Sequence, residues 1–279
     1  MRNSFSTLAS TAAIRRPPTM PQLLRLALPG ALSAWEAAGF ARNSDPNDIA
    51  LQIGGVDIGV PGGAEASWGW RDGPQSREGI DRPPSHWAEL GAAGFTEVDV
   101  QGIATSIDDM NAAEHAEHID EREAVAMPHP NGALSLYSVC ATTPDLDSTI
   151  AAFEAAGVDL RRVRKPQEPG SSLSKGLQMA FFKFGTPPHR DVILELIAPG
   201  GGAGAPLPGG FPLKPDGACI AGLVVRVAAL APVAELLGPE LLGRERDAVQ
   251  GKGMRIATLN HAKCGLPLPL AFMSAPASS

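Results

Sequence analysis

An internal repeat is the feature that most limits how this chain can fold. Ala34–Phe40 (AWEAAGF) parallels Ala152–Val158 (AFEAAGV), and Asp57–Gly62 (DIGVPG) parallels Glu195–Gly200 (ELIAPG). In each copy a helical pattern precedes an apolar strand pattern that ends at Pro-Gly. A single such unit leaves one apolar face uncovered, so the units are expected to pair and bury it.

The second copy has the clearest pattern. Leu134–Ala141 alternates as a half-buried strand does, and Asp145 is placed to cap a helix that runs to Gly157. Further strands are predicted at Asp159–Val163, Gln178–Phe184 and Val192–Ala198. Beyond a glycine-rich linker at 200–210, a third copy is predicted, with strands at Cys219–Val227, Met254–Leu259 and Leu268–Met273 and a helix near Pro232–Leu237.

The N-terminal copy follows the same order of elements. A strand at Gln22–Leu28 precedes a helix at Ala31–Ala38, and Gly54-Gly55 joins strands at Ile49–Ile53 and Val56–Val60. The copies therefore indicate β-α-β-β-β units. Residues 61–130 lack a clear pattern, apart from a helical stretch at His86–Ala93 and an acidic stretch at Asp108–Glu123.

Three segments carry a resemblance to a known family: LYSVCATTPDLDSTIAAFEAAG (136–157), QMAFFKFG (178–185) and VILELIAPG (192–200). They resemble the vicinal oxygen chelate superfamily, which includes glyoxalases and bleomycin-resistance proteins. The resemblance implies an α+β fold of tandem βαβββ modules, paired around a cup-shaped cavity. It divides the chain into a degenerate N-terminal module with an insertion (21–130) and a domain of two modules (132–199 and 217–275). Because modules of this superfamily often pair between chains, it also suggests a homodimer.

The resemblance makes a specific demand on metal ligands. Metal-dependent members carry a His early in the first strand of each module and a Glu in the fourth. Ser138 stands at the first His position and Glu195 matches the carboxylate, whereas the next module places Gly222 and Phe272 at these positions. Only Glu195 can bind a metal, so we expect no metal and no other cofactor.

Glu195, Ser138, Arg255 and His129 are the candidate site residues. Glu195 would be the catalytic residue, a base that removes a proton beside a carbonyl, and the other three would bind the ligand. Structural alternatives remain open. Glu195 could pair with an arginine such as Arg255, and His129 lies in the proline-flanked turn MPHPNG.

Two functions therefore remain open. The first is a glyoxalase-like protein that binds or transforms a small oxygenated metabolite without a complete metal site; a lyase, an isomerase and a dioxygenase are all compatible with it. The alternative is a metal-dependent lyase or dioxygenase with ligands from elsewhere, such as His115 and His118, whose i, i+3 spacing suits a metal. The missing His ligands favour the first function.

Charge and composition restrict the partners and the compartment. With 23 Lys+Arg against 30 Asp+Glu, the net charge is −7, which argues against nucleic acid, and no apolar run is long enough to span a membrane. The first twenty residues contain three Arg and no acid, as a transit peptide would. Residues 1–19 thus predict import into a plastid or mitochondrion; without import, we expect a cytoplasmic protein.

Overall fold

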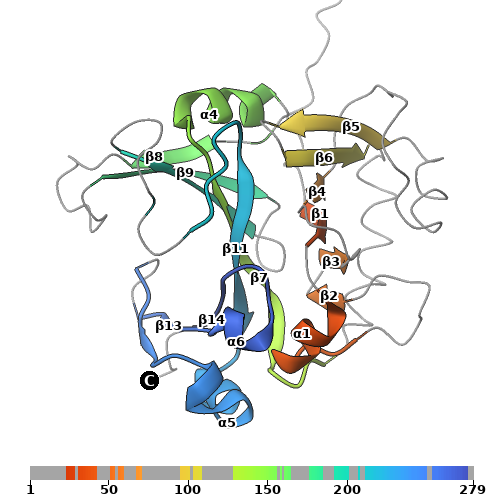
Figure 1. The fold of residues 1–279 in the computed structure, drawn as a ribbon, viewed down its shortest axis with the longest axis vertical. Coiled ribbons are helices and arrows are strands. Elements are labelled where there is room, and N and C mark those ends of the chain that lie inside the picture. The colour runs from red at the N-terminus through yellow and green to blue at the C-terminus, as the bar shows by residue number, and fades with distance from the viewer. Residues whose placement is uncertain are drawn as a thin grey trace, which may run out of the picture.

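The computed structural model contains two β-sheets that lie side by side (Figure 1). It describes residues 23–28, 31–42, 51–53, 56–59, 67–70, 95–100, 103–108, 128–155, 158, 160–164, 176–184, 192–200, 207, 211–249 and 253–275. The predicted helix at 86–93 and both His115 and His118 fall outside these residues. Within them, no helix is long and apolar enough to cross a membrane.

The C-terminal sheet has eight strands in two halves. The first half contains β7 (Ala133–Thr142), α4 (Leu146–Ala155), β8 (Leu160–Arg164), β9 (Leu177–Phe184) and β10 (Val192–Pro199). The second contains β11 (Cys219–Val227), α5 (Leu230–Leu241), β12 (Arg246–Asp247), β13 (Arg255–Thr258), α6 (His261–Cys264) and β14 (Leu270–Ser274).

Strand pairing shows that these halves are equivalent modules. The sheet order is β12-β13-β14-β11-β7-β10-β9-β8. In each module the first strand is parallel to the last, β7 to β10 and β11 to β14, while the antiparallel pair β7 and β11 joins the modules. The predicted α+β fold of tandem βαβββ modules is confirmed. The sheet does not close, and both ends curve away from the other sheet (Figure 1), giving what we call the concave face.

The N-terminal sheet repeats this pairing with fewer strands. Its elements are β1 (Leu23–Ala27), α1 (Leu32–Ala37), β2 (Leu51–Ile53), β3 (Val56–Gly59), β4 (Ser67–Trp70), β5 (Phe95–Val100) and β6 (Ile103–Asp108). β1 is parallel to β3, β4 is parallel to β6, and β1 pairs antiparallel with β4. Strands β4 to β6 lie in the stretch whose sequence pattern was unclear.

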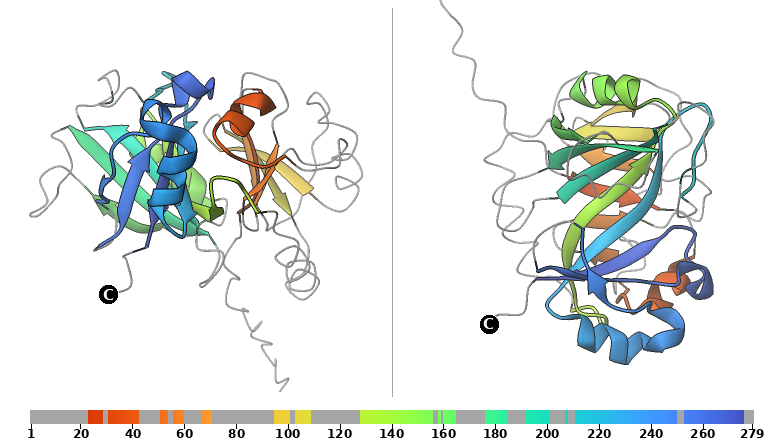
Figure 2. Two further views of the ribbon diagram at one scale, coloured as in Figure 1. Left: turned by 90° about the horizontal axis from the view of Figure 1, so that it is seen from below. Right: turned by 90° about the vertical axis from the view of Figure 1, so that its left-hand side faces the viewer.

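The two sheets lie next to each other (Figure 2) and share one hydrophobic core, which lies behind the concave face. Buried residues from β1, α1, β2 and β3 pack with those of the eight-stranded sheet and of helices α4 and α5. The Phe40 ring illustrates the contact, because it packs edge-on against Trp35 at 5.5 Å and stacks on Phe272 at 6.2 Å between ring centroids. Burial of such aromatic rings fixes one sheet against the other.

Asn131 connects the end of α1 to the start of β7. Its Nδ2 donates to the Ala38 carbonyl at 2.9 Å, its backbone N–H donates to the Gly39 carbonyl at 3.0 Å, and its Oδ1 accepts from the Ala133 N–H at 3.0 Å. Asn131 is fully buried. Helix α1 ends just before Gly39, because Gly39 has a φ of 81°, a left-handed conformation that glycine adopts without steric cost.

Candidate functional site

The concave face can be assigned residue by residue from the alternation along β10. Val192, Leu194, Leu196 and Ala198 belong to the core shared with the N-terminal sheet. Successive side chains of a strand point to opposite faces, so Ile193, Glu195 and Ile197 lie on the concave face. The structure thus places Glu195 on the concave face.

Glu195 lies at the centre of a row that crosses four strands. Its register partners are Phe181 on β9 and Cys140 on β7, and Cys140 in turn pairs with Gly222 on β11. Glu195 is only 3% exposed. A buried carboxyl requires polar contacts to offset the loss of hydration, and Glu195 does have interactions within the protein.

The Cys140 thiol is affected by its position beside Glu195. Burial raises the pKa of Cys140 well above its ordinary value, the charge of Glu195 raises it further, and the Ser138 hydroxyl acts in the opposite direction. Low dielectric and a nearby negative charge both disfavour a thiolate. Cys140 is therefore a neutral thiol at neutral pH, which is unsuited to nucleophilic attack.

Ser138 supplies an unsatisfied polar group to the same face. It pairs with Ile193 on β10 and with Val224 on β11. The side chain is fully buried, and its hydroxyl makes no well-formed hydrogen bond to the described residues, although it lies close enough to the Cys140 thiol to lower the pKa of that thiol. An unsatisfied buried hydroxyl costs about 1 to 3 kcal/mol, so a ligand oxygen at this position would be stabilised.

Apolar side chains flank this polar centre at both ends of the face. One cluster comprises Tyr137, Val224, Ile256, Ala271 and Met273. The other comprises Met179, Ile197 and Leu207, against which Leu177, Phe181, Phe211 and Leu213 pack. The polar groups of the face thus lie within a mainly apolar surface, the usual composition of a small-molecule site.

The segment between the modules forms part of the second cluster. Phe211 and Leu213 lie against it, and the Thr142 hydroxyl donates to the Pro212 carbonyl at 2.6 Å. The sequence predicted a linker at 200–210 and no element at 211–213. Leu207 from this linker, together with Phe211 and Leu213, instead packs against Ile197 of β10 on the concave face.

The other expected metal-ligand positions do not suit a metal. A Cβ at Gly222 would lie 3.1 Å from the Pro269 carbonyl oxygen, so any side chain there would require the neighbouring backbone to shift. Phe272 does not face the site, because it packs in the shared core against Phe40. The true counterpart of Glu195 is Ala271, which pairs with Val224 as Glu195 pairs with Cys140.

The position expected from the sequence, Phe272, is therefore wrong by one residue. The conclusion that this module has no carboxylate there still holds, because Ala271 has none. Ser138, Gly222 and Ala271 offer no imidazole or carboxylate, so the residues present do not fit a divalent metal. Likewise, the described part of the chain contains no cluster of three His, Cys, Asp or Glu residues able to hold one.

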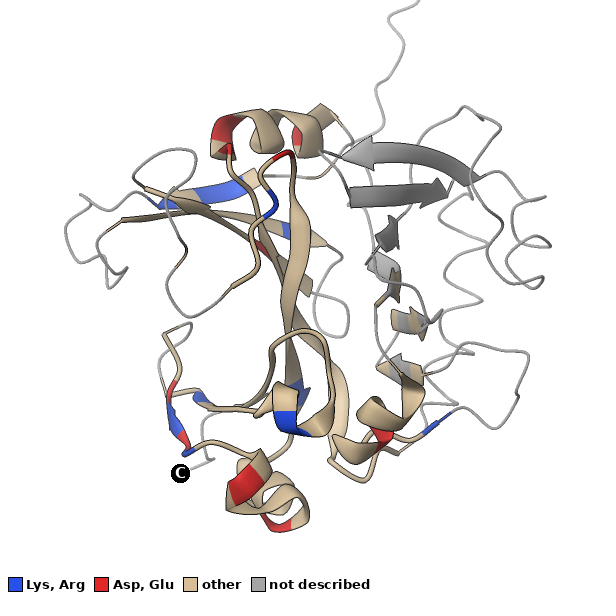
Figure 3. Ribbon diagram, in the orientation of Figure 1, with Lys and Arg blue, Asp and Glu red and all other residues tan. Residues whose placement is uncertain are grey.

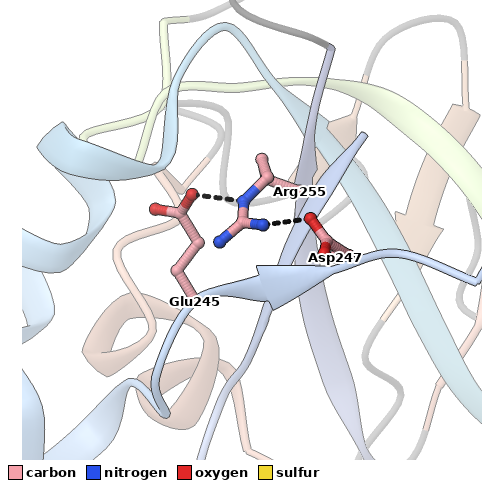
Figure 4. A network of polar contacts seen from close by, with 3 residues as sticks. All are labelled: Glu245, Asp247 and Arg255. Carbon is pink, nitrogen blue, oxygen red and sulfur yellow. Dashed lines mark hydrogen bonds and ion pairs between the residues drawn. The ribbon is translucent and has the colours of Figure 1, made fainter. Parts of the chain in front are cut away.

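Arg255 lies away from this centre and has partners of its own. Its Nε donates to Glu245 Oε1 at 2.7 Å and its Nη1 donates to Asp247 Oδ1 (Figure 4). Three strands separate β13 from β10, which is about 19 Å along the sheet. The structure therefore does not bring Arg255 and Glu195 together.

His129 lies at the junction of α1 and β7. Its Nδ1 accepts a hydrogen bond from the Ala41 N–H at 3.0 Å, and its ring packs edge-on against Phe40 at 5.4 Å. The imidazole is buried beside the shared core. This placement gives His129 a structural contact between the sheets, far from the row that contains Glu195.

Sequence reasoning missed Arg164 and Cys140. Arg164 follows Arg162 at a spacing of two, which places both on one face of a strand, and Cys140 follows Ser138 at the same spacing. That spacing could have identified both residues. Only the pairing of β7, β8, β9 and β10 shows that Arg164 and Cys140 lie on the same face of the sheet.

Comparison with known proteins identifies the fold. No protein-family model and no curated protein matches the sequence. A halotolerant catechol dioxygenase superposes with a TM-score of 0.50 at 12% identity, covering 92% of this chain and 86% of the other. A catechol 2,3-dioxygenase gives a TM-score of 0.50 at 13% identity, covering 94% and 91%.

Both similarities extend over the two sheets. Glyoxalase I from Zea mays is a weaker match, with a TM-score of 0.37 at 13% identity, covering 93% of this chain and 69% of the other. At such identities the similarity shows the fold and not the activity. The chain has the fold of the vicinal oxygen chelate superfamily.

Proposed function

We propose that this protein binds a small oxygenated molecule on the concave face, and that binding does not require a metal. The buried Ser138 hydroxyl carries this proposal: it makes no well-formed hydrogen bond to the described residues, and the Cys140 thiol beside it is only a weak acceptor. It lies one residue pair away from Glu195, within a surface that is otherwise mainly apolar. An oxygen on the ligand would satisfy the hydroxyl, and its carbon skeleton would cover the apolar clusters.

Proton transfer by Glu195 is a second candidate function. Its carboxyl lies on the same face as Ser138 and one register pair further along β10, and the neighbouring Cys140 thiol is held neutral. A ligand carbonyl that accepts from Ser138 would place its adjacent C–H group near Glu195. In that arrangement Glu195 would accept the proton and return it.

Thermal denaturation with a panel of small hydroxy and keto compounds tests the binding. We expect some of them to raise the melting temperature of the native protein, and Ser138→Ala to reduce that shift. Ser274→Ala is the matched control, because Ser274 follows Met273 on β14 and so faces the opposite side. Equal shifts in the native protein and both variants would contradict the proposed site.

The same compounds separate binding from catalysis. In heavy water, a keto compound that is only bound keeps its C–H signals, whereas proton transfer by Glu195 exchanges them for deuterium. Glu195→Gln should abolish exchange while the compound still binds. If a compound binds to the native protein without exchange, the binding function stands, and proton transfer by Glu195 is excluded for that compound.

A further inference from the structure

Arg164 is a cation at the edge of the concave face. It pairs with Met179 on β9, which packs beside Ile197 on that face. Its guanidinium carbon lies 5.5 Å from the centroid of the Phe181 ring, and Phe181 is the register partner of Glu195. Register partners share a face of the sheet, so Arg164 lies on the same face as Glu195.

The Arg164 guanidinium contacts an aromatic ring, and no acid among the described residues is found paired with it. A cation over the face of Phe181 is attracted by the ring, and a guanidinium so placed still has N–H groups that can donate to a ligand. Its Nε is buried and has no hydrogen-bond partner among the described residues. None of the ion pairs found between described residues includes it. A buried N–H without a partner is costly unless a ligand accepts from it.

The strands around Arg164 are basic although the chain as a whole is acidic. Strands β7 to β11 contain a single acid, Glu195, and the five basic residues Arg161, Arg162, Arg164, Lys183 and Arg226. Figure 3 shows Lys and Arg along β8 at the upper edge of the sheet. This local excess of positive charge favours an anion at that edge.

We propose that the molecule bound on the concave face carries an anionic group, a carboxylate or a phosphate, and that Arg164 binds this group. The inference rests on the proposed function and adds the ligand class. Phe181 lies between β8 and Glu195 in the row across the sheet, so the anionic group and the Glu195 carboxyl need not touch. The rest of the ligand then extends from Arg164 past Phe181 toward Glu195.

Matched acids and amides test this assignment. Acetate with acetamide and phenylacetate with phenylacetamide differ in charge but hardly in shape, and phenyl phosphate tests the alternative anion. By titration calorimetry, we expect at least one acid to bind about tenfold or more tightly than its neutral counterpart, as charge-assisted hydrogen bonds from an arginine are strong. Arg164→Met, which keeps an apolar stem over Phe181, should remove that preference and leave amide binding unchanged.

Arg246→Met is the matched control. Arg246 lies on β12, at the opposite edge of the sheet, and its loss removes the same charge without affecting the proposed contact. Far-ultraviolet circular dichroism checks that both variants fold. Equal binding of acids and amides to the native protein, or an unchanged preference in Arg164→Met, would overturn the role of Arg164. The proposed binding function would still stand in either case. Failure of every acid, amide and phosphate to bind would count against the proposed function as well.

Discussion

Glu195 and Cys140 face each other across strands β10 and β7, so a carboxyl and a thiol are buried together at the centre of the concave face. Burial is the larger cause of the raised Cys140 pKa, and the charge of Glu195 is the second. The pKa of the Cys140 thiol therefore reports whether the Glu195 carboxyl is charged and close to it.

Glu195→Gln should lower the pKa of the Cys140 thiol. The variant removes the negative charge that disfavours the thiolate, but burial remains, so the pKa should stay above its ordinary value. Alkylation of Cys140 by iodoacetamide, followed by peptide mass spectrometry across a pH series, measures this shift. An alkylation profile that is identical in the native protein and the variant would show that the carboxyl does not act on the thiol.

Cys140 should also make the protein less stable in alkaline solution. Because its folded pKa lies above the unfolded value of about 8.5, its contribution is fully present below that pH and is lost as the pH rises toward the folded pKa. Urea unfolding at about pH 7 and about pH 10 should show a smaller alkaline loss in Cys140→Ala than in the native protein. Burial raises the pKa of Cys264 too, so part of the loss should remain.

Asn131→Ala should destabilise the protein strongly. The change removes two hydrogen bonds made by a fully buried side chain and leaves the Ala38 carbonyl and the Ala133 N–H unsatisfied. A loss of about 2 to 4 kcal/mol in the free energy of unfolding is expected. Asn260→Ala, at an exposed helix cap, should cost only about 1 kcal/mol. Comparable losses in denaturant unfolding would argue against Asn131 as the link between α1 and β7.

Gly39→Ala and Gly132→Ala form a second matched pair. Both glycines have a positive φ, which costs an alanine about 1 to 2 kcal/mol. A Cβ at Gly39 would also lie 2.8 Å from Leu236 Cδ2 and 2.9 Å from Asn131 Cβ, whereas a Cβ at Gly132 meets nothing within 4 Å. Thermal unfolding should therefore show a larger decrease in melting temperature for Gly39→Ala. The reverse order would contradict the close packing at the end of α1.

The purified protein should contain well below one equivalent of zinc, nickel, iron or manganese per chain. Ser138, Gly222 and Ala271 occupy the positions where ligands would be needed, and Glu195 alone binds a divalent metal weakly. Elemental analysis of the protein, before and after dialysis against a chelator, measures this content. Stoichiometric metal that is retained through dialysis would require ligands outside the described residues.

Local sequence determined most elements of the C-terminal modules. The strand predicted at Leu134–Ala141 is β7, and the helix predicted from Asp145 is α4, where the Asp145 carboxylate accepts from the Ser148 N–H at 3.0 Å. The strand that contains Glu195 is β10. These features depend on alternation and on capping between near neighbours, which a sequence displays directly.

Only the tertiary structure decided which residues share the concave face. Neighbouring residues of a strand point to opposite faces, so an error of one residue in the alignment exchanges the core face for the concave face. The pairing of Val224 with Ala271, which matches the pairing of Cys140 with Glu195, shows that Ala271 and not Phe272 is the counterpart of Glu195. Arg164 meets Phe181 only through the pairing of β8 with β9, and Arg255 is held by Glu245 and Asp247 only through the fold of β12 and β13. Alternation and capping within short segments thus predict the elements of the modules, whereas strand register between distant segments decides which side chains share the concave face.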